Sequence, residues 1–267
     1  MDQSSNKNAS LPPDHPRYES LKYRHKIIEG MKNLIVAEAG LIAHGRGECF
    51  DYILGEKTSK TAKKAINAAV ASFLLAENPI ISINGNVAAL CPDEIVKLSK
   101  ILDIPLEINL FYRKEGRIKA ITKKLKSAGA ANLLGTDEKK MVNIDELSSN
   151  RRKVDPKGIY KADWVMVPLE DGDRTEALKK NGKNIIAIDL NPISRTSIWA
   201  DITIVDNIVR TIPKMIETAQ NYKTLTKKEL MEIQGEFNNK ENIKNTLDLI
   251  IDYIASQKEN AFTILKK

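Results

Sequence analysis

Residues 189–196, with the sequence DLNPISRT, combine side chains that suit phosphate and ribose, and they follow an apolar run that predicts a strand. Arg195 supplies a planar cation for bidentate phosphate contact, and Ser194 and Thr196 supply hydroxyl donors. Asp189, at the strand end, could accept a hydrogen bond from a ribose hydroxyl or hold Mg²⁺ through water. The segment therefore predicts part of a nucleotide-phosphate site. A surface ion pair of Arg195 is the alternative interpretation.

Other predicted strands are also followed by segments rich in Asn, Asp and Gly, namely residues 84–86, 168–174 and 206–207. In open parallel sheets, ligands bind at the carboxyl ends of strands, where helix N-termini present free N–H groups to anions. Each segment also has a local explanation. Asp173 and Glu176 have the spacing of a capping box, and Asn207 could cap the next helix. Because such segments occur at successive strand ends, we nevertheless expect them to form one ligand-binding edge of the sheet.

Residues 41–51, with the sequence LIAHGRGECFD, place His44 and Arg46 around two glycines. We expect this segment to connect two helices, where Gly45 and Gly47 could bring backbone N–H groups close to an anion. A tight connection between helices would use the same glycines. His44 could act as an acid–base group because its pKa lies near neutrality, or it could only fix the loop by hydrogen bonds.

The order of the expected elements predicts a doubly wound α/β fold with a mainly parallel sheet. Short β-branched runs that lack hydrophobic–polar alternation are typical of strands covered on both faces. They lie at residues 79–83, 105–110, 132–134, 164–167, 184–188 and 202–205. Helical spacing is found at residues 18 to about 40, 59–76, 92–102, 115–128 and 173–180.

The ends of the chain differ from this pattern. Residues 1–14 are polar and contain two prolines, so we expect a flexible tail. Residues 15–220 form the expected catalytic domain, which includes the N-terminal helices. Residues 221–267 form an expected helical extension, with helices near 225–233 and 243–254. The apolar stripe of the second helix could pack on its own domain or on another subunit.

Composition excludes several classes of protein. The 267 residues carry 42 Lys and Arg against 35 Asp and Glu, a formal net charge of +7 that suits phosphates as readily as nucleic acid. Aromatic residues are only 5% of the chain, which leaves few stacking platforms for nucleic acid. The two cysteines lie far apart and the histidines lack the spacing of metal ligands, so we expect neither disulfides nor a zinc site. The sequence has no GxSxG motif, which argues against covalent acyl-enzyme chemistry. With no apolar run long enough for a membrane helix, we expect a cytoplasmic protein.

Several longer motifs resemble those of one family, the archaeal phosphopantothenate synthetases, also called 4-phosphopantoate–beta-alanine ligases. The resemblance rests on HPRYESLKYR at residues 15–24, GLIAHGRGECFDYILGE at 40–56, ISINGN at 81–86, VPLEDGDR at 167–174, IDLNPISRT at 188–196 and ITIVDN at 202–207. Together these motifs cover most of residues 15–213. The resemblance implies a Rossmann-like fold, a homodimer, and a ligase of coenzyme A biosynthesis that condenses 4-phosphopantoate with beta-alanine, using ATP and Mg²⁺.

The resemblance also implies a set of ATP contacts, namely Arg24, Arg46, Asp189, Leu190, Asn191, Arg195, Thr196, Asn207 and Ile208. Arg46 and His44 are the catalytic candidates, and no protein metal ligand is assigned. Such a ligase needs cations that stabilise crowded phosphates rather than an enzyme nucleophile. An ADP-forming phosphotransferase is the alternative enzyme, and a non-catalytic nucleotide or nucleic-acid binding module is the alternative outside enzymes.

Overall fold

The computed structural model describes residues 12, 14, 17–144 and 149–264. The expected tail, residues 1–14, lies almost wholly outside the described residues. A six-stranded parallel sheet forms the centre of the molecule, and its spatial order is β3-β2-β1-β6-β7-β8. The strands are β1 (Pro79–Ile83), β2 (Leu106–Ile108), β3 (Leu133–Leu134), β6 (Trp164–Pro168), β7 (Asn184–Ile188) and β8 (Ile202–Ile204). All six predicted strands are confirmed.

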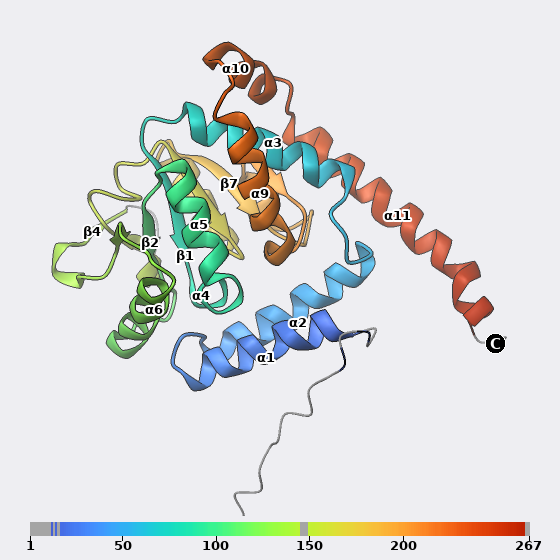
Figure 1. Cartoon of the computed structure of the whole chain (residues 1–267), viewed down its shortest axis with the longest axis horizontal. Coiled ribbons are helices and arrows are strands. Elements are labelled where there is room, and N and C mark those ends of the chain that lie inside the picture. The colour runs from blue at the N-terminus through green and yellow to red at the C-terminus, as the bar shows by residue number, and fades with distance from the viewer. Residues whose placement is uncertain (1–11, 13, 15–16, 145–148, 265–267) are drawn as a thin grey trace, which may run out of the picture.

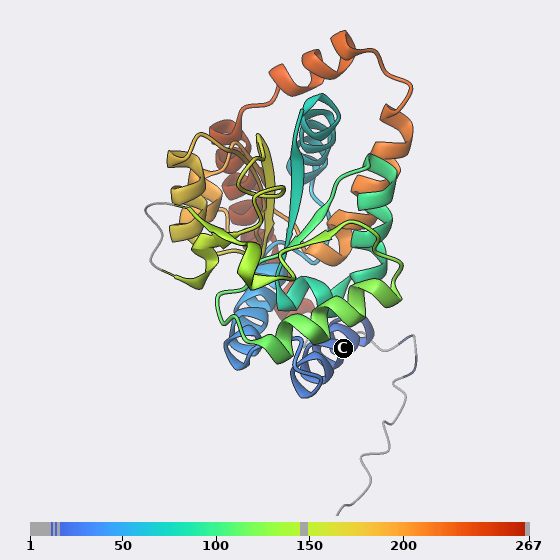
Figure 2. The same ribbon diagram turned by 90° about the vertical axis from the view of Figure 1, so that its left-hand side faces the viewer.

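Helices cover both faces of the sheet (Figures 1 and 2). One layer holds α3 (Lys60–Leu75), α5 (Pro92–Leu102) and α9 (Ile208–Tyr222), and the other holds α7 (Gly172–Lys180) and α8 (Arg195–Trp199). The longer strands are buried from their second residue onward, which explains their continuous apolar sequences. Two large apolar clusters, one on each side of the sheet, form the core.

The chain enters the sheet at β1 and builds outward to β2 and β3, then returns to β6 and builds the other way. The order therefore reverses between β1 and β6, as in doubly wound nucleotide-binding folds of the Rossmann type. Loops that leave these two strands diverge at their carboxyl ends and open a crevice there. The predicted fold class is confirmed.

The N-terminal helices differ from the prediction. We expected one helix from Tyr18 to about Gly40, but the structure has α1 (Tyr18–Lys32) and α2 (Glu38–Ile53). Leu34 takes a left-handed conformation with φ 60°, and the N–H groups of Ile35 and Val36 both donate to the carbonyl of Gly30. This turn ends α1, although the apolar spacing continues through it. Figure 1 shows α1 and α2 side by side below the sheet.

The remaining elements complete the two sides of the sheet. Helices α4 (Gly85–Leu90) and α6 (Glu115–Ser127) follow β1 and β2. Between β3 and β6 the chain forms 3₁₀ turns η1 (Glu138–Lys140) and η2 (Asn150–Arg152), and a ribbon of β4 (Val142–Asn143) and β5 (Lys153–Val154). None of the elements in this ribbon region was predicted.

The C-terminal extension forms α10 (Lys227–Gly235) and α11 (Asn239–Ile264), close to the predicted helices. Asn239 and Asn242 on α11 hydrogen-bond the N–H and C=O of Thr203, at 2.8 and 2.9 Å. Because β8 is an edge strand, these side chains satisfy backbone groups that another chain could otherwise pair with. The end of α11 extends beyond the body of the protein (Figure 1).

Glu107 ties the ribbon region to the sheet. The side chain is fully buried on β2, and its carboxylate accepts the N–H groups of Asp155 and Ile159, at 3.0 and 2.7 Å. Burial raises the pKa of Glu107 to about 7, against the opposing effect of these two hydrogen bonds. The ordinary pKa of a glutamate is near 4.5.

We predict that this carboxyl makes the free energy of unfolding depend on pH. Because its pKa is raised in the folded protein, its contribution to stability is complete below about pH 4.5. That contribution is lost as the pH rises through about 7, by up to about 3 kcal/mol. Glu107→Gln should flatten this part of the pH profile. Denaturant unfolding of both proteins between about pH 4.5 and pH 8 tests it, and parallel profiles would contradict the prediction.

Candidate active site

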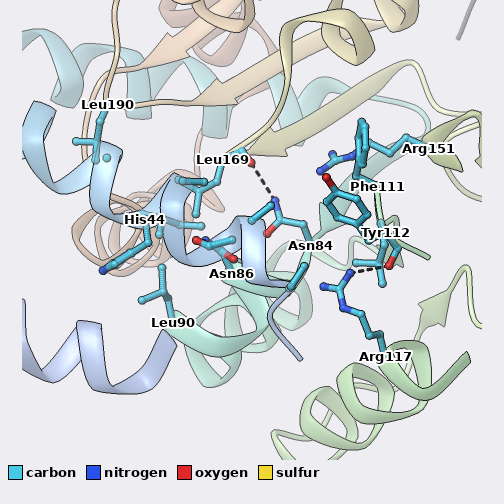
Figure 3. Close-up of a pocket in the computed structure, with 18 of the residues that line it drawn as sticks. His44, Asn84, Asn86, Leu90, Phe111, Tyr112, Arg117, Arg151, Leu169 and Leu190 are labelled. Atoms are coloured by element: carbon cyan, nitrogen blue, oxygen red, sulfur yellow. Dashed lines mark hydrogen bonds between the residues drawn. The ribbon is translucent and has the colours of Figure 1, made fainter. Parts of the chain in front are cut away.

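A cavity lies at the carboxyl ends of the strands, where the order of the sheet reverses (Figure 3). Helix α2 forms one wall, and the rest is formed by the loops after β1, β2, β6 and β7, the start of α9, and residues of α4, α6 and η2. Among the residues that line it are Gly40, His44, Gly47, Asn84, Asn86, Phe111, Tyr112, Arg117, Arg151, Leu169, Leu190, Asn207 and Ile208. The sequence-predicted residues His44, Leu190, Asn207 and Ile208 thus meet at one cavity.

Asn84 holds the ends of β1 and β6 together. Its amide group donates to the carbonyls of Pro168 and Leu169, at 2.9 and 3.1 Å, and its oxygen accepts the N–H of Val87 to cap α4. Asn86, two residues on, donates to the carbonyl of Gly40 at 2.9 Å and so joins α4 to α2. These amides explain the Asn-Gly-Asn sequence as a structural junction.

A buried carboxylate on α2 fixes that helix over the sheet edge. Asp51 accepts hydrogen bonds from Asn207, at 2.8 Å, and from two nitrogens of Arg210, at 3.0 and 2.5 Å. Arg210 also binds Asp206 at the end of β8. One turn earlier on α2, Gly47 faces Leu190, and a Cβ there would lie 3.5 Å from the leucine side chain. The C-terminal half of α2 therefore lies against the loops after β7 and β8.

The prediction of a glycine-rich loop at residues 41–51 is wrong, since the whole segment lies inside α2. Helical N–H groups are bonded within the helix and cannot cradle a phosphate. Close packing is found at Gly40, just before this segment, where a Cβ would lie 2.4 Å from the Asn86 side chain, whereas a Cβ on Gly45 would meet no atom within 4 Å. What α2 presents to the cavity is side chains, among them His44 and Glu48.

The predicted phosphate segment after β7 is held by its own hydrogen bonds. The carboxylate of Asp189 accepts the N–H of Asn191, at 2.9 Å, and the hydroxyl of Ser194. Ser194 in turn caps α8 by accepting the N–H of Ser197. Burial raises the pKa of Asp189, while these hydrogen bonds and the charge of Arg46 oppose the rise. The charge of Arg46 thus acts on Asp189.

Arg195 turns away from this loop and pairs with Asp173 and with Glu176, the latter at 2.6 Å. This is the surface ion pair considered as the alternative interpretation. The capping prediction is wrong here, since Asp171 is the residue that caps α7, through the N–H of Arg174 at 2.9 Å. Asp173 and Glu176 are left free to bind Arg195. The predicted cap of α9 by Asn207 is confirmed.

Other predicted ATP contacts lie outside the cavity lining. Thr196 is buried and donates to the carbonyl of Glu170 at 3.1 Å, and Arg24 pairs with Glu48 at 2.9 Å, which joins α1 to α2. Contact of ATP with every residue of the predicted set, including those that line the cavity, stays a prediction.

His44 lies half-buried on α2 beside Glu48. Its Nε2 atom is buried and has no hydrogen-bond partner in the described part of the chain. Burial lowers the pKa of His44, the charge of Glu48 raises it and that of Arg24 lowers it further. The imidazole is therefore neutral near pH 7 and able to accept a proton.

The sequence analysis missed two arginines that line the cavity, Arg117 on α6 and Arg151 in η2. Arg117 comes just after β2, so the rule applied to the other strand ends could have found it. Arg151 gave no such signal, because β4, β5 and the turn between them do not belong to the main sheet.

Comparison with known proteins agrees with this geometry. A family model described as phosphopantothenate/pantothenate synthetase matches residues 61–253. The chain belongs to this family. A curated relative from Thermococcus kodakarensis is 52% identical over 94% of this chain and 95% of its own length. Relatives from Thermococcus onnurineus, 53% identical over 93% and 95%, and Methanosarcina mazei, 49% identical over 91% and 95%, are similar too. All three are named 4-phosphopantoate–beta-alanine ligase.

We predict that Asp51→Ala loosens α2 in this synthetase. The substitution leaves the partly buried Arg210 with one carboxylate fewer, which should lower the free energy of unfolding by about 3 kcal/mol. Glu38→Ala, which removes an exposed carboxylate from the same helix, is the control. Denaturant unfolding measures both variants, and an equal loss in the two would show that Asp51 has no special role.

Proposed function

We propose that this protein is an ATP-dependent ligase that condenses 4-phosphopantoate with beta-alanine to 4'-phosphopantothenate, AMP and diphosphate. Its relatives carry the name of that reaction. The observation that carries the proposal is the cavity at the reversal point of the sheet, where His44, Leu190, Asn207 and Ile208 meet. The relatives support the ligase rather than the phosphotransferase considered as an alternative.

ATP binds along the edge formed by the loops after β7 and β8, facing α2. Leu190 and Ile208 offer apolar surface there, and Arg46 lies near Asp189. Arg24 and Arg195 are now paired with Glu48 and with Asp173 and Glu176. The pairs of Arg195 are exposed and therefore weak, so this arginine can exchange a carboxylate for a phosphate when ATP binds. The pair of Arg24 is partly buried, so its exchange would cost more.

The reaction proceeds in two displacements. The pantoate carboxylate attacks the α-phosphorus of ATP and diphosphate leaves, which gives an acyl adenylate. The amine of beta-alanine then attacks the acyl carbon, AMP leaves with the bonding electrons, and the nitrogen loses a proton. The described residues that line the cavity include no Ser, Thr, Cys or Lys, which agrees with a mechanism that uses no covalent enzyme intermediate.

His44 accepts the proton that the attacking amine must lose. It lies on the cavity wall, its Nε2 atom is free of protein partners in the described residues, and its ring is neutral at pH 7. Arg46 contributes by stabilising the negative charge that moves onto the phosphates.

Mg²⁺ belongs to the proposal as a partner of the nucleotide. The described residues contain no group of three or more His, Cys, Asp or Glu side chains placed to hold a metal ion. Mg²⁺ needs no such group, because it keeps several waters and takes ligands from substrate phosphates. Asp189, within reach of Arg46, is the carboxylate we expect to approach it, through water. When bound, the ion would neutralise charge on the leaving diphosphate.

We propose a homodimer in the cytoplasm. Exposed apolar side chains on and beside α8 and on α11 support association, namely Ile193, Ile198, Trp199, Leu249, Ile251 and Ile254. In the described chain, no helix has the length and apolar character to span a bilayer. Cys49 and Cys91 are free thiols, as a reducing compartment requires.

The product of ATP cleavage tests the proposal. The purified protein, given ATP, 4-phosphopantoate and beta-alanine, should release AMP and diphosphate in proportion to the phosphopantothenate formed. Omitting beta-alanine should stop turnover after the adenylate. Release of ADP instead of AMP would support the phosphotransferase, and failure to form phosphopantothenate would rule out the ligase.

We predict that His44→Gln slows amide formation about a hundredfold while the adenylate still forms. Exchange of labelled diphosphate into ATP, which depends on 4-phosphopantoate alone, should stay near the wild-type rate. Because burial lowers the pKa of His44, the wild-type rate should fall only below about pH 6.5, and the variant should lose this acidic limb. His25→Gln, at an exposed position on α1, is the control. An equal loss of exchange and synthesis would contradict the proton-acceptor role.

A further inference from the structure

A second cavity lies between α1, α2 and the start of α9, beside the active-site cavity. It measures about 180 Å³ and shares His44, Glu48 and Asn207 with the first cavity. Figure 3 shows His44 on the side of the first cavity away from Arg117 and Arg151. The shared residues therefore form a wall between the two cavities, at the end of the active site where we place ATP.

The second cavity is acidic, although the chain as a whole carries a net charge of +7. Among the described residues, one guanidinium lines it, that of Arg210, and this group is bound to an acid of the same lining. The carboxylates that line it are those of Glu19, Glu48, Asp51 and Glu56. A cavity of this sign attracts a cation and repels the phosphates of ATP and of 4-phosphopantoate.

Glu48 is the acid that lines both cavities. Its side chain is 14% exposed, and its carboxylate accepts three hydrogen bonds from Arg24, between 2.9 and 3.3 Å. One turn earlier on α2 lies His44, whose pKa the charge of Glu48 raises. A carboxylate withdrawn from water costs free energy unless a cation pairs with it. If ATP takes Arg24, Glu48 therefore needs another cation.

Beta-alanine brings that cation into the proposed reaction. Its amine is protonated at neutral pH, as an amine on an alkyl chain is in lysine. An ammonium group has three N–H donors, so one carboxylate and one or two further acceptors can bind it. Mg²⁺ fits this place less well, because the described residues bring no three acidic, His or Cys side chains together to hold a metal ion.

We propose that Glu48 binds the ammonium group of beta-alanine at the wall between the two cavities. The inference rests on the proposed ligase function. ATP draws Arg24 to a phosphate, and the ammonium group takes its place on Glu48, so that both charges stay paired. The negative field of the second cavity orients the amino acid, with its ammonium group toward that cavity and its carboxylate away from it. The nitrogen then lies beside His44, whose Nε2 atom has no partner among the described residues.

Glu48→Gln tests this site, because it removes the charge and keeps an oxygen that can accept from Arg24. The KM for beta-alanine should rise roughly ten- to a hundredfold, since a hydrogen bond between two charged groups is lost. Exchange of labelled diphosphate into ATP with 4-phosphopantoate needs no amine and should stay near the wild-type rate. Hydroxylamine is uncharged at neutral pH and converts an acyl adenylate to a hydroxamate. Both proteins should form this hydroxamate at similar rates.

Glu48→Asp keeps the charge and should recover part of the affinity for beta-alanine. Glu29→Gln is the matched control, since it removes a carboxylate from an exposed position on α1 that lines neither cavity.

Equal losses of exchange, hydroxamate and synthesis would show that Glu48 only joins α1 to α2, and would overturn the inference. An unchanged KM for beta-alanine would overturn it as well. A changed dependence of the exchange on Mg²⁺ would assign Glu48 to the metal ion instead. A wild type that makes no phosphopantothenate would overturn the proposed function.

Discussion

The ion pair between Asp51 and Arg210 is the contact on which the active-site cavity depends. It joins α2, which precedes the sheet in the chain, to α9, which follows the last strand. With Asn207 bound to the same carboxylate, α2 lies across the loops after β7 and β8. A parallel sheet alone offers an open crevice at its carboxyl edge. In this protein the helix closes that crevice and brings His44 to its wall.

The second determinant is the junction between β1 and β6. Asn84 satisfies two carbonyls of the neighbouring loop, and Glu170 lies buried between Arg151 and Arg174 just beyond it. Buried charges are costly unless they are paired, and here Glu170 pairs with both Arg151, which lines the cavity, and Arg174, which does not. The acids fix the position of Arg151, while Arg117 keeps a charge that no described acid neutralises. The two ends of the cavity therefore differ in character, one suited to a nucleotide and the other to an anion.

The glycines of α2 show how one residue type supports opposite predictions. Gly45 and Gly47 around His44 are typical of a loop that wraps an anion, but the structure keeps them helical, and the close contact is made at Gly40, where a Cβ would lie 2.4 Å from the Asn86 side chain. Anion-binding loops and tightly packed helices both favour glycine, which has no Cβ. A glycine in the sequence therefore does not show which of the two structures it belongs to. The cap of α7 was predicted wrongly for a similar reason, because Asp171 and Asp173 are both suitable N-cap residues. In the structure Asp171 caps the helix, and Asp173 pairs with Arg195.

The sequence by itself determined the fold class, the six strands and most helices, because strands buried on both faces require uninterrupted apolar runs and helices require spacing near 3.6 residues. It also indicated the family through several long motifs, and the family model confirms it. Only the tertiary structure decided which of these residues meet. Arg117 and Arg151 come from separate segments and share one end of the cavity, while Arg195 leaves its own loop to pair with α7. Such contacts depend on how the layers of helices and strands pack in space. A local sequence pattern does not predict which residues far apart in the chain come together.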